Sequence, residues 1–221
     1  MPPVERSAMY AVCLLAGTLL IIVAAALHPN LQGDGAAQLA MIAACASWRA
    51  VHWAFLFGFA LSLTGLVGVA QHHSGTPGEG PTRAGLTVGV FAYSCWTVIV
   101  AFMVGTGWSL ARVYDSALPG LTATRAVFLY DMSHPLGLAA QRLGGFALGI
   151  STYLFGWGVL RGRLLPRALG WAGVASGLIG LALAAGFPET TKADQAAFVL
   201  PVLWQCATGL LLLGRRPAGA A

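Results

Sequence analysis

Residues 8–27 read AMYAVCLLAGTLLIIVAAAL, an apolar run without a single charged side chain. A helix needs about 20 such residues to cross the hydrocarbon core of a bilayer, where every backbone hydrogen bond must be made inside the helix. The run therefore predicts a membrane-spanning helix. A secretory signal peptide is the alternative, because Arg6 precedes the run and Ala24 and Ala26 offer a small-residue cleavage pattern. A signal core, however, usually has only about 7 to 15 apolar residues.

Similar charge-free runs follow along the whole chain. Asp, Glu, Lys and Arg make up only 9% of the 221 residues, whereas soluble proteins carry about 25%. That composition excludes an ordinary soluble protein and predicts an all-α integral membrane bundle, built as one transmembrane domain over residues 1–221. The six predicted spans lie at about residues 8–27, 51–70, 84–110, 136–160, 168–187 and 196–213.

The lysines and arginines near the span ends predict the orientation. Seven lie on the side that holds both termini and five on the other side, and cytoplasmic loops carry the excess of positive charge. Arg161, Arg163 and Arg167 crowd one short connection and decide the count. Both termini are therefore predicted to be cytoplasmic. The bias toward Ala, Gly, Leu and Arg indicates a GC-rich bacterial source, and hence a multi-pass protein of the bacterial inner membrane.

The net charge of +5 does not indicate a nucleic-acid-binding protein, because the basic residues are scattered singly at the ends of apolar runs. The lipid bilayer is the partner that this composition predicts. The cysteines give no disulfide framework, since three of the four fall inside spans and only Cys45 lies in an outer segment. Several glycines recur four residues apart, which predicts close packing between helices of the same chain. These pairs are Gly85 and Gly89, Gly145 and Gly149, Gly158 and Gly162, and Gly173 and Gly177.

The loops on the predicted outer side are the longer ones, and they carry helical patterns of their own. Residues 35–48 place Leu39 and Ile42 on one apolar side, which predicts a short helix on the membrane surface or over the bundle. Residues 121–132 predict a second short helix. We expect the fourth span to begin anew at Pro135, because proline suits the first helical position and disfavours a helix before it.

Three of the five histidines, His28, His52 and His134, fall at the outer boundary of the spans. Neutral imidazole is the commonest protein ligand of transition metals, so these three with a carboxylate would satisfy a zinc, copper or iron ion, or bind a haem. The alternative is that histidines, like the tryptophans around them, favour the lipid headgroup layer. His72 and His73 lie in a predicted cytoplasmic loop, where we expect them to be solvated. The carboxylates on the outer side include Asp34, Asp131 and Glu189.

Arg142 is the one charge clearly inside a predicted span. Such a residue is costly in lipid and usually faces the bundle interior or a wet cavity. One interpretation is an outer ligand-binding cavity formed by Arg142, Gln141 and His134, with Asp131 as the carboxylate nearest in sequence. Asp115 and Glu189 are the other carboxylates on that side that could pair with the guanidinium. The alternative is that Arg142 extends to a headgroup phosphate.

Three segments carry a resemblance to a known group of proteins. They are LHPN at residues 27–30, WRAVHWAFLFGFALSLTGL at residues 48–66 and LPRALGWAG at residues 165–173. In these features the chain resembles small six-helix bacterial membrane proteins of a domain-of-unknown-function family. The resemblance implies the six-helix fold and supplies no activity.

Three classes of function remain, since no span carries a known catalytic motif. The first is a small polytopic membrane protein that binds a lipid or small ligand in an outer cavity. The second is a membrane enzyme, either a metal- or haem-dependent oxidoreductase or an acid-catalysed isoprenoid- or lipid-modifying enzyme that uses Asp131, Glu189 and His134. The third is a transporter, for which Arg142 is the only charged feature of a span that offers support.

Overall fold

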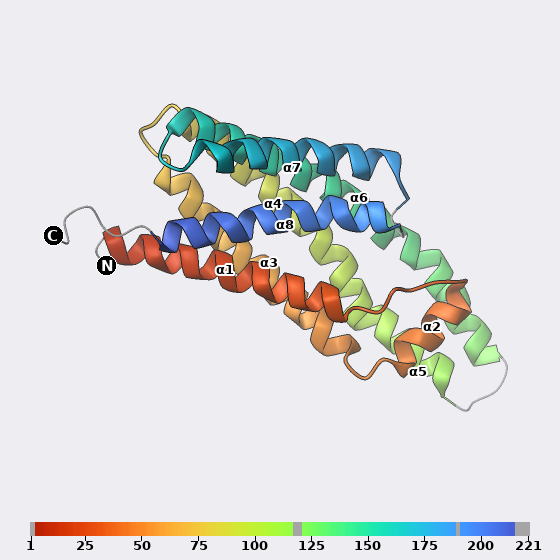
Figure 1. The fold of residues 1–221 in the computed structure, drawn as a ribbon. Coiled ribbons are helices and arrows are strands. Elements are labelled where there is room, and N and C mark those ends of the chain that lie inside the picture. The colour runs from red at the N-terminus through yellow and green to blue at the C-terminus, as the bar shows by residue number, and fades with distance from the viewer. Residues whose placement is uncertain (1–2, 117–120, 189–190, 215–221) are drawn as a thin grey trace.

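The computed structural model describes residues 3–116, 121–188 and 191–214, and over these residues the fold is all-α without strands. Long helices form an elongated bundle, with two short helices at one end (Figure 1). Six helical segments are long and apolar enough to cross a membrane, which confirms the predicted fold class. The elements are α1 (Pro3–Leu27), α2 (Gly35–Ala44), α3 (Trp48–His72), α4 (Glu79–Phe102), the π-helix η1 (Met103–Gly107), α5 (Trp108–Asp115), α6 (Leu121–Gly162), α7 (Arg167–Gly186) and α8 (Lys192–Leu213).

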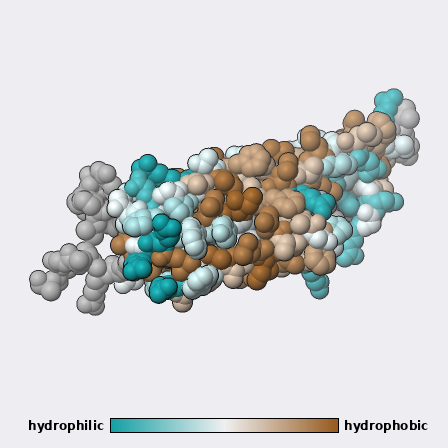
Figure 2. Space-filling model, turned by 90° about the horizontal axis from the view of Figure 1, so that it is seen from above, coloured by the Kyte–Doolittle hydropathy of each residue, from teal (hydrophilic) through white to brown (hydrophobic). Residues whose placement is uncertain are grey.

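The two ends of the bundle differ in what they carry. Helix α1 begins and helix α8 ends at one end, which we call the terminal end, whereas α2 and α5 lie at the other end, which we call the cap end (Figure 1). Helix α1 packs against α3 and α8, α4 packs against α3 and α6, and α7 packs against α6 and α8. Hydrophobic surface gathers over the middle of the bundle and hydrophilic surface lies near both ends (Figure 2). This distribution is typical of a membrane-spanning bundle.

Helix α2 confirms the short helix expected over residues 35–48. Its N-terminus is capped by Asp34, whose carboxylate accepts a hydrogen bond of 2.9 Å from the backbone N–H of Ala37. Leu39 and Ile42 are fully buried, because α2 packs against α5 and α6. The helix therefore forms part of a cap over the bundle.

The expected break at Pro135 is wrong, because α6 runs unbroken through it for 42 residues. The proline ring nitrogen cannot donate to the carbonyl one turn earlier, and a proline inside a helix costs about 3 kcal/mol. Packing of the preceding residues against α2 and α5, with Ala126 and Tyr130 buried, offsets that cost. At about 1.5 Å per residue the helix is about 63 Å long, twice the thickness of the hydrocarbon core. The segment before Pro135 therefore reaches out to the cap.

Glycines set the distance between the long helices, as the four-residue spacing predicts. A Cβ on Gly149 would lie 2.9 Å from the carbonyl oxygen of Gly177, and a Cβ on Gly156 would lie 2.5 Å from the backbone nitrogen of Val174. Both distances are too short for a side chain. Helices α6 and α7 therefore pack backbone against backbone, and this tight seam holds one wall of the bundle fixed.

Candidate functional site

A cavity of about 620 Å³ lies toward the cap end, and its walls come from α1, α3, α4, α6 and α8. Sites for small molecules usually have volumes of about 300–1,000 Å³. Gln38 of α2 reaches the same cavity from the cap. Every long helix except α7 thus contributes side chains to the lining of the cavity. Among the described residues, this cavity is the main candidate for a ligand-binding site.

The lining changes from polar to apolar with depth. Along α3 the lining residues are His52, then Phe55 and Phe59 at successive turns away from the cap. Along α8 the first residue, Lys192, lines the cavity near the cap and Phe198 lines it deeper. Both helices therefore present a polar group where they begin and apolar rings below it.

Aromatic rings form the deeper wall. The ring centroids of Trp96 and Phe198 lie 4.4 Å apart, and those of Phe59 and Phe198 lie 6.4 Å apart. Such contacts stabilise a pair of rings by about 0.5–1.5 kcal/mol beyond the burial of their area. The rings come from α3, α4 and α8, so the wall is fixed by three separate helices.

Two of the three predicted histidines meet at the cavity. His28 follows the end of α1 and His52 lies in the first turns of α3, and their ring centroids are 5.1 Å apart. Trp48 lies behind them, with its ring centroid 4.3 Å from His52 and 5.2 Å from His28. The three rings form one cluster at the polar end of the cavity.

Trp48 is a residue that the sequence reasoning placed only in the headgroup layer. It is fully buried, and its indole N–H donates a hydrogen bond of 3.0 Å to the carbonyl oxygen of Met103. Met103 begins the π-helix η1, whose wider turns interrupt the regular hydrogen bonds of a helix. Trp48 thus ties α3 to this irregular turn. The four-residue spacing from Trp48 to His52 was the available signal, because it places both rings on one helix face.

The position of the proton on His52 follows from one contact. Its Nδ1 lies 2.7 Å from the carbonyl oxygen of Trp48. A carbonyl oxygen only accepts, so Nδ1 carries the proton, and in the neutral ring Nε2 has a free lone pair. None of the described residues forms a hydrogen bond with Nε2. Since His52 lines the cavity while its Nδ1 is turned back to its own helix, Nε2 is the polar atom that it offers to a ligand.

His28 is neutral at pH 7 as well. Burial lowers its pKa below the usual 6.5, and a hydrogen bond to the backbone of Pro29 opposes this shift only in part. The polar end of the cavity therefore carries the uncharged imidazole of His28 beside the ring of His52.

The third histidine, His134, lines the same cavity from α6 but has different neighbours. Its ring stacks on Tyr130, with centroids 4.7 Å apart. The Tyr130 hydroxyl donates a hydrogen bond of 2.8 Å to Oε1 of Gln38, whose Nε2 donates in turn to the carbonyl oxygen of Gly33 at 3.0 Å. This chain of contacts fixes α2 over the cavity and holds Gln38 in its lining. Gln38 is a second residue that the sequence reasoning missed.

A metal site stays a prediction. Among the residues that the structure describes, no group of three or more His, Cys, Asp or Glu side chains is close enough together to hold a metal ion. Asp34 is engaged as the cap of α2, and Glu189 lies outside the described residues. The geometry supports a pair of imidazoles beside a cavity.

Arg142 lies beside the cavity wall on α6, whereas its neighbour Gln141 lines the cavity. Its guanidinium donates from Nε to the carbonyl oxygen of Ala184 at 3.4 Å and from Nη2 to that of Ala185 at 3.5 Å. These carbonyls belong to the last turn of α7, where a positive charge is favourable. Arg142 thus caps α7 at the cap end.

Asp131 has a different neighbour from the one expected. Its carboxylate lies against Gly35, the first residue of α2, where a Cβ would collide with it. A negative charge at a helix N-terminus is favourable. Asp115, the other described carboxylate considered for Arg142, forms a loose ion pair of 4.0 Å with Arg112. The predicted set of Arg142, Gln141, Asp131 and His134 is therefore divided between the cavity and the helix ends around it.

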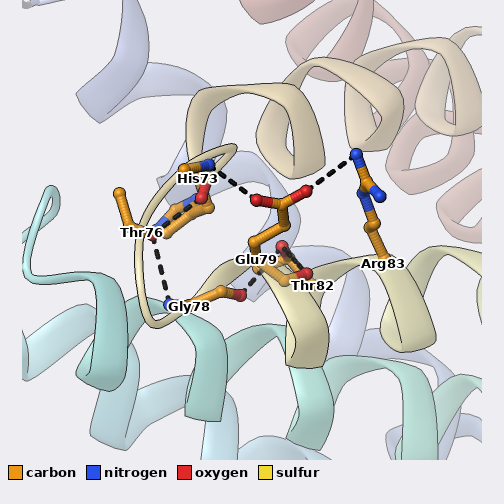
Figure 3. Close-up of polar contacts among 7 residues, drawn as sticks. His73, Thr76, Gly78, Glu79, Thr82 and Arg83 are labelled. Carbon is orange, nitrogen blue, oxygen red and sulfur yellow. Dashed lines mark hydrogen bonds and ion pairs between the residues drawn. The ribbon is translucent and has the colours of Figure 1, made fainter.

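The expectation that His73 is solvated is wrong, because this side chain is fully buried at the terminal end. Its Nδ1 lies 3.0 Å from the carbonyl oxygen of Val69, and its ring lies so close to Gly162 that a Cβ there would be 2.5 Å from Cδ2. The turn that follows is held by Glu79, which accepts a hydrogen bond of 2.6 Å from Gly75 and pairs with Arg83 at 2.7 Å (Figure 3). The whole turn packs onto the end of α6.

Comparison with known proteins adds no family: no family model, no curated protein and no solved structure matches this chain. The resemblance to six-helix proteins of unknown function stays a prediction.

Proposed function

We propose that this chain is a multi-pass protein of the bacterial inner membrane that binds a lipid or another small amphiphilic ligand in the cap-end cavity. In this proposal the terminal end is cytoplasmic, as the positive charges near the span ends predict, and the cavity lies toward the extracytoplasmic side. The observation that carries the proposal is the cavity of about 620 Å³, whose lining changes from imidazole, amide and ammonium groups near the cap to aromatic rings below.

An amphiphile fits this gradient because each part of it meets matching groups. A polar head would lie near His28, His52 and Lys192, while an apolar body would lie against the rings of Phe59 and Phe198. Burial of apolar area contributes about 25 cal/mol per Å², so the deep wall supplies affinity and the few polar groups supply orientation.

The test is retention of a ligand by the purified protein. Native mass spectrometry after purification in a mild detergent is expected to show one small lipid bound to the wild type. Ala25 lines the cavity, so Ala25→Phe is expected to fill part of it and abolish binding. Ala60 is exposed on α3 away from the cavity, and Ala60→Phe is the matched control that is expected to bind like the wild type. Equal binding by Ala25→Phe and the wild type would contradict the proposal.

An enzyme is the second candidate, favoured by the two adjacent imidazoles at 5.1 Å between ring centroids. A neutral imidazole can act as a general base toward a bound hydroxyl group. Mass analysis of the ligand recovered after incubation separates the two candidates, because a binding protein returns it unchanged.

A further inference from the structure

The hydrogen-bonding groups of the cavity narrow the class of ligand, an inference that rests on the proposed function. The decisive group is Nε2 of His52, which has a lone pair and no hydrogen-bond partner among the described residues. His28 adds a second neutral ring beside it. A ligand that only accepts hydrogen bonds, such as a ketone or an ether, would leave the lone pair of His52 unsatisfied, and an unsatisfied buried polar group is unfavourable.

The charges of the residues that line the cavity also indicate an uncharged ligand. Lys192 is the one charged residue that lines the cavity within the described parts of the chain, and no carboxylate lines it there. A cationic ligand would therefore meet a positive charge without a compensating negative one. A phosphate monoester, with a charge of about −1.5 to −2 at pH 7, would bring more negative charge than the single Lys192 neutralises. An uncharged ligand that donates a hydrogen bond matches both the lone pair of His52 and the charge of the cavity lining.

The size of the cavity and the shape of its wall indicate a ligand with a single hydrocarbon chain. A volume of about 620 Å³ lies within the range of about 300–1,000 Å³ that is usual for sites of small molecules. A ligand with one short hydrocarbon chain is a molecule of that size. The aromatic wall formed by Phe59, Trp96 and Phe198 offers ring faces against which flat, unsaturated carbon groups can pack.

We propose that the cavity binds a neutral single-chain alcohol of isoprenoid type, whose hydroxyl group donates a hydrogen bond to Nε2 of His52. In this arrangement the hydrocarbon chain of the ligand extends toward the aromatic wall. The Trp48 carbonyl holds the imidazole in the tautomer that accepts from the ligand.

The experiment compares ligands that differ in the donor alone. Farnesol, its methyl ether and farnesyl phosphate are titrated onto the wild type in detergent, and the bound fraction is measured by native mass spectrometry. We expect farnesol to bind about tenfold more tightly than the ether, which is the usual effect of one hydrogen bond. We expect the preference to disappear in His52→Phe, which keeps an aromatic ring next to Trp48.

The outcomes separate this inference from the proposed function. If farnesol and its ether bind equally, or if the phosphate binds most tightly, the inference is wrong while the cavity still binds amphiphiles. If His52→Phe is folded and keeps the preference, His52 is not the acceptor and the inference is again wrong. If none of the three ligands binds, the inference is wrong, and the proposed function then depends on whether the wild type retains a lipid that Ala25→Phe loses. Because the comparison of ligands in the wild type decides alone, a variant that does not fold leaves the test valid.

Discussion

A buried histidine lies at each end of helix α3, His52 within its first turns and His73 directly after its last residue, and the two make the same local contact. His52 near the cap bonds through Nδ1 to the carbonyl oxygen of Trp48, and His73 at the terminal end does the same to Val69, in each case four residues earlier. Their surroundings differ. His52 lines a cavity of about 620 Å³, whereas His73 is enclosed by the turn after α3 and by Gly162 of α6. Residue type, burial and tautomer are thus shared, and open space beside the ring is what distinguishes a candidate site from a structural contact.

The largest effect is expected when each of the two histidines is replaced by alanine, because the two variants should differ in stability and in ligand binding. His73→Ala leaves a hole in a closed contact, so we expect the free energy of unfolding to fall by about 2–4 kcal/mol. His52→Ala enlarges an existing cavity and is expected to destabilise less while weakening the binding of farnesol about tenfold, the usual effect of one hydrogen bond. Thermal melting in detergent and native mass spectrometry measure the two properties. A greater loss of stability in His52→Ala than in His73→Ala would contradict the assignment of His73 to a structural contact and of His52 to a binding site.

The next effect tests the closed packing of the terminal end. A Cβ on Gly78 would collide with the carbonyl oxygen of Gly158, whereas nothing lies within 4 Å of a Cβ on Gly80. We expect Gly78→Ala to cost about 1–3 kcal/mol of stability, because the turn must move away from α6. Gly80→Ala is the control and is expected to melt like the wild type. Similar melting temperatures for the two variants would show that the turn is not tightly packed.

A smaller effect is expected in the pH dependence of the melting temperature, to which His28 at the cap end contributes. The pKa of His28 is lowered in the folded protein by burial, so the unfolded chain binds more protons as the pH falls below about 6.5. The stability that this neutral ring contributes is complete above that pH and is lost as the pH falls toward the lowered pKa. We expect the melting temperature of the wild type to decrease from pH 7 to pH 5 more steeply than that of His28→Phe. His52 and Lys192 line the same cavity and remain in both proteins. Parallel pH profiles would contradict this role of His28.

The smallest effect belongs to Arg142, which is half-buried and caps the last turn of α7. We expect Arg142→Ala to cost about 1 kcal/mol of stability, within the range for a charge at a helix terminus. Arg142→Lys is expected to recover part of the loss, because it keeps the charge without the planar donors. Farnesol binding is expected to persist in both variants. Loss of binding in Arg142→Lys with unchanged melting would instead place Arg142 in the site.

Much of the fold can be predicted from the sequence, because lipid excludes charges from nearly the whole length of the spans and Arg142 is the one clear exception. The path of α6 through Pro135 cannot, since the preference against a helix before proline is local and the opposing stabilisation comes from α2 and α5. The burial of His73 was missed for a similar reason: a turn rich in Gly, Ser and Pro is typical of a solvated loop, and only the packing against α6 closes it. Of the site, the histidines were predicted from their position at the span ends, whereas Trp48 and Gln38 depend on contacts between distant segments.

The most direct test of the account is photoaffinity labelling of the wild type with a farnesol analogue that carries a diazirine on its chain. The labelled residues are mapped by peptide mass spectrometry. We expect the label on the deeper cavity-lining residues of α3, α4 and α8, with competition by farnesol and loss of the label in Ala25→Phe. Labels spread over the lipid-facing sides of all six spanning helices, unaffected by farnesol, would show that the cavity holds no ligand and would contradict the account.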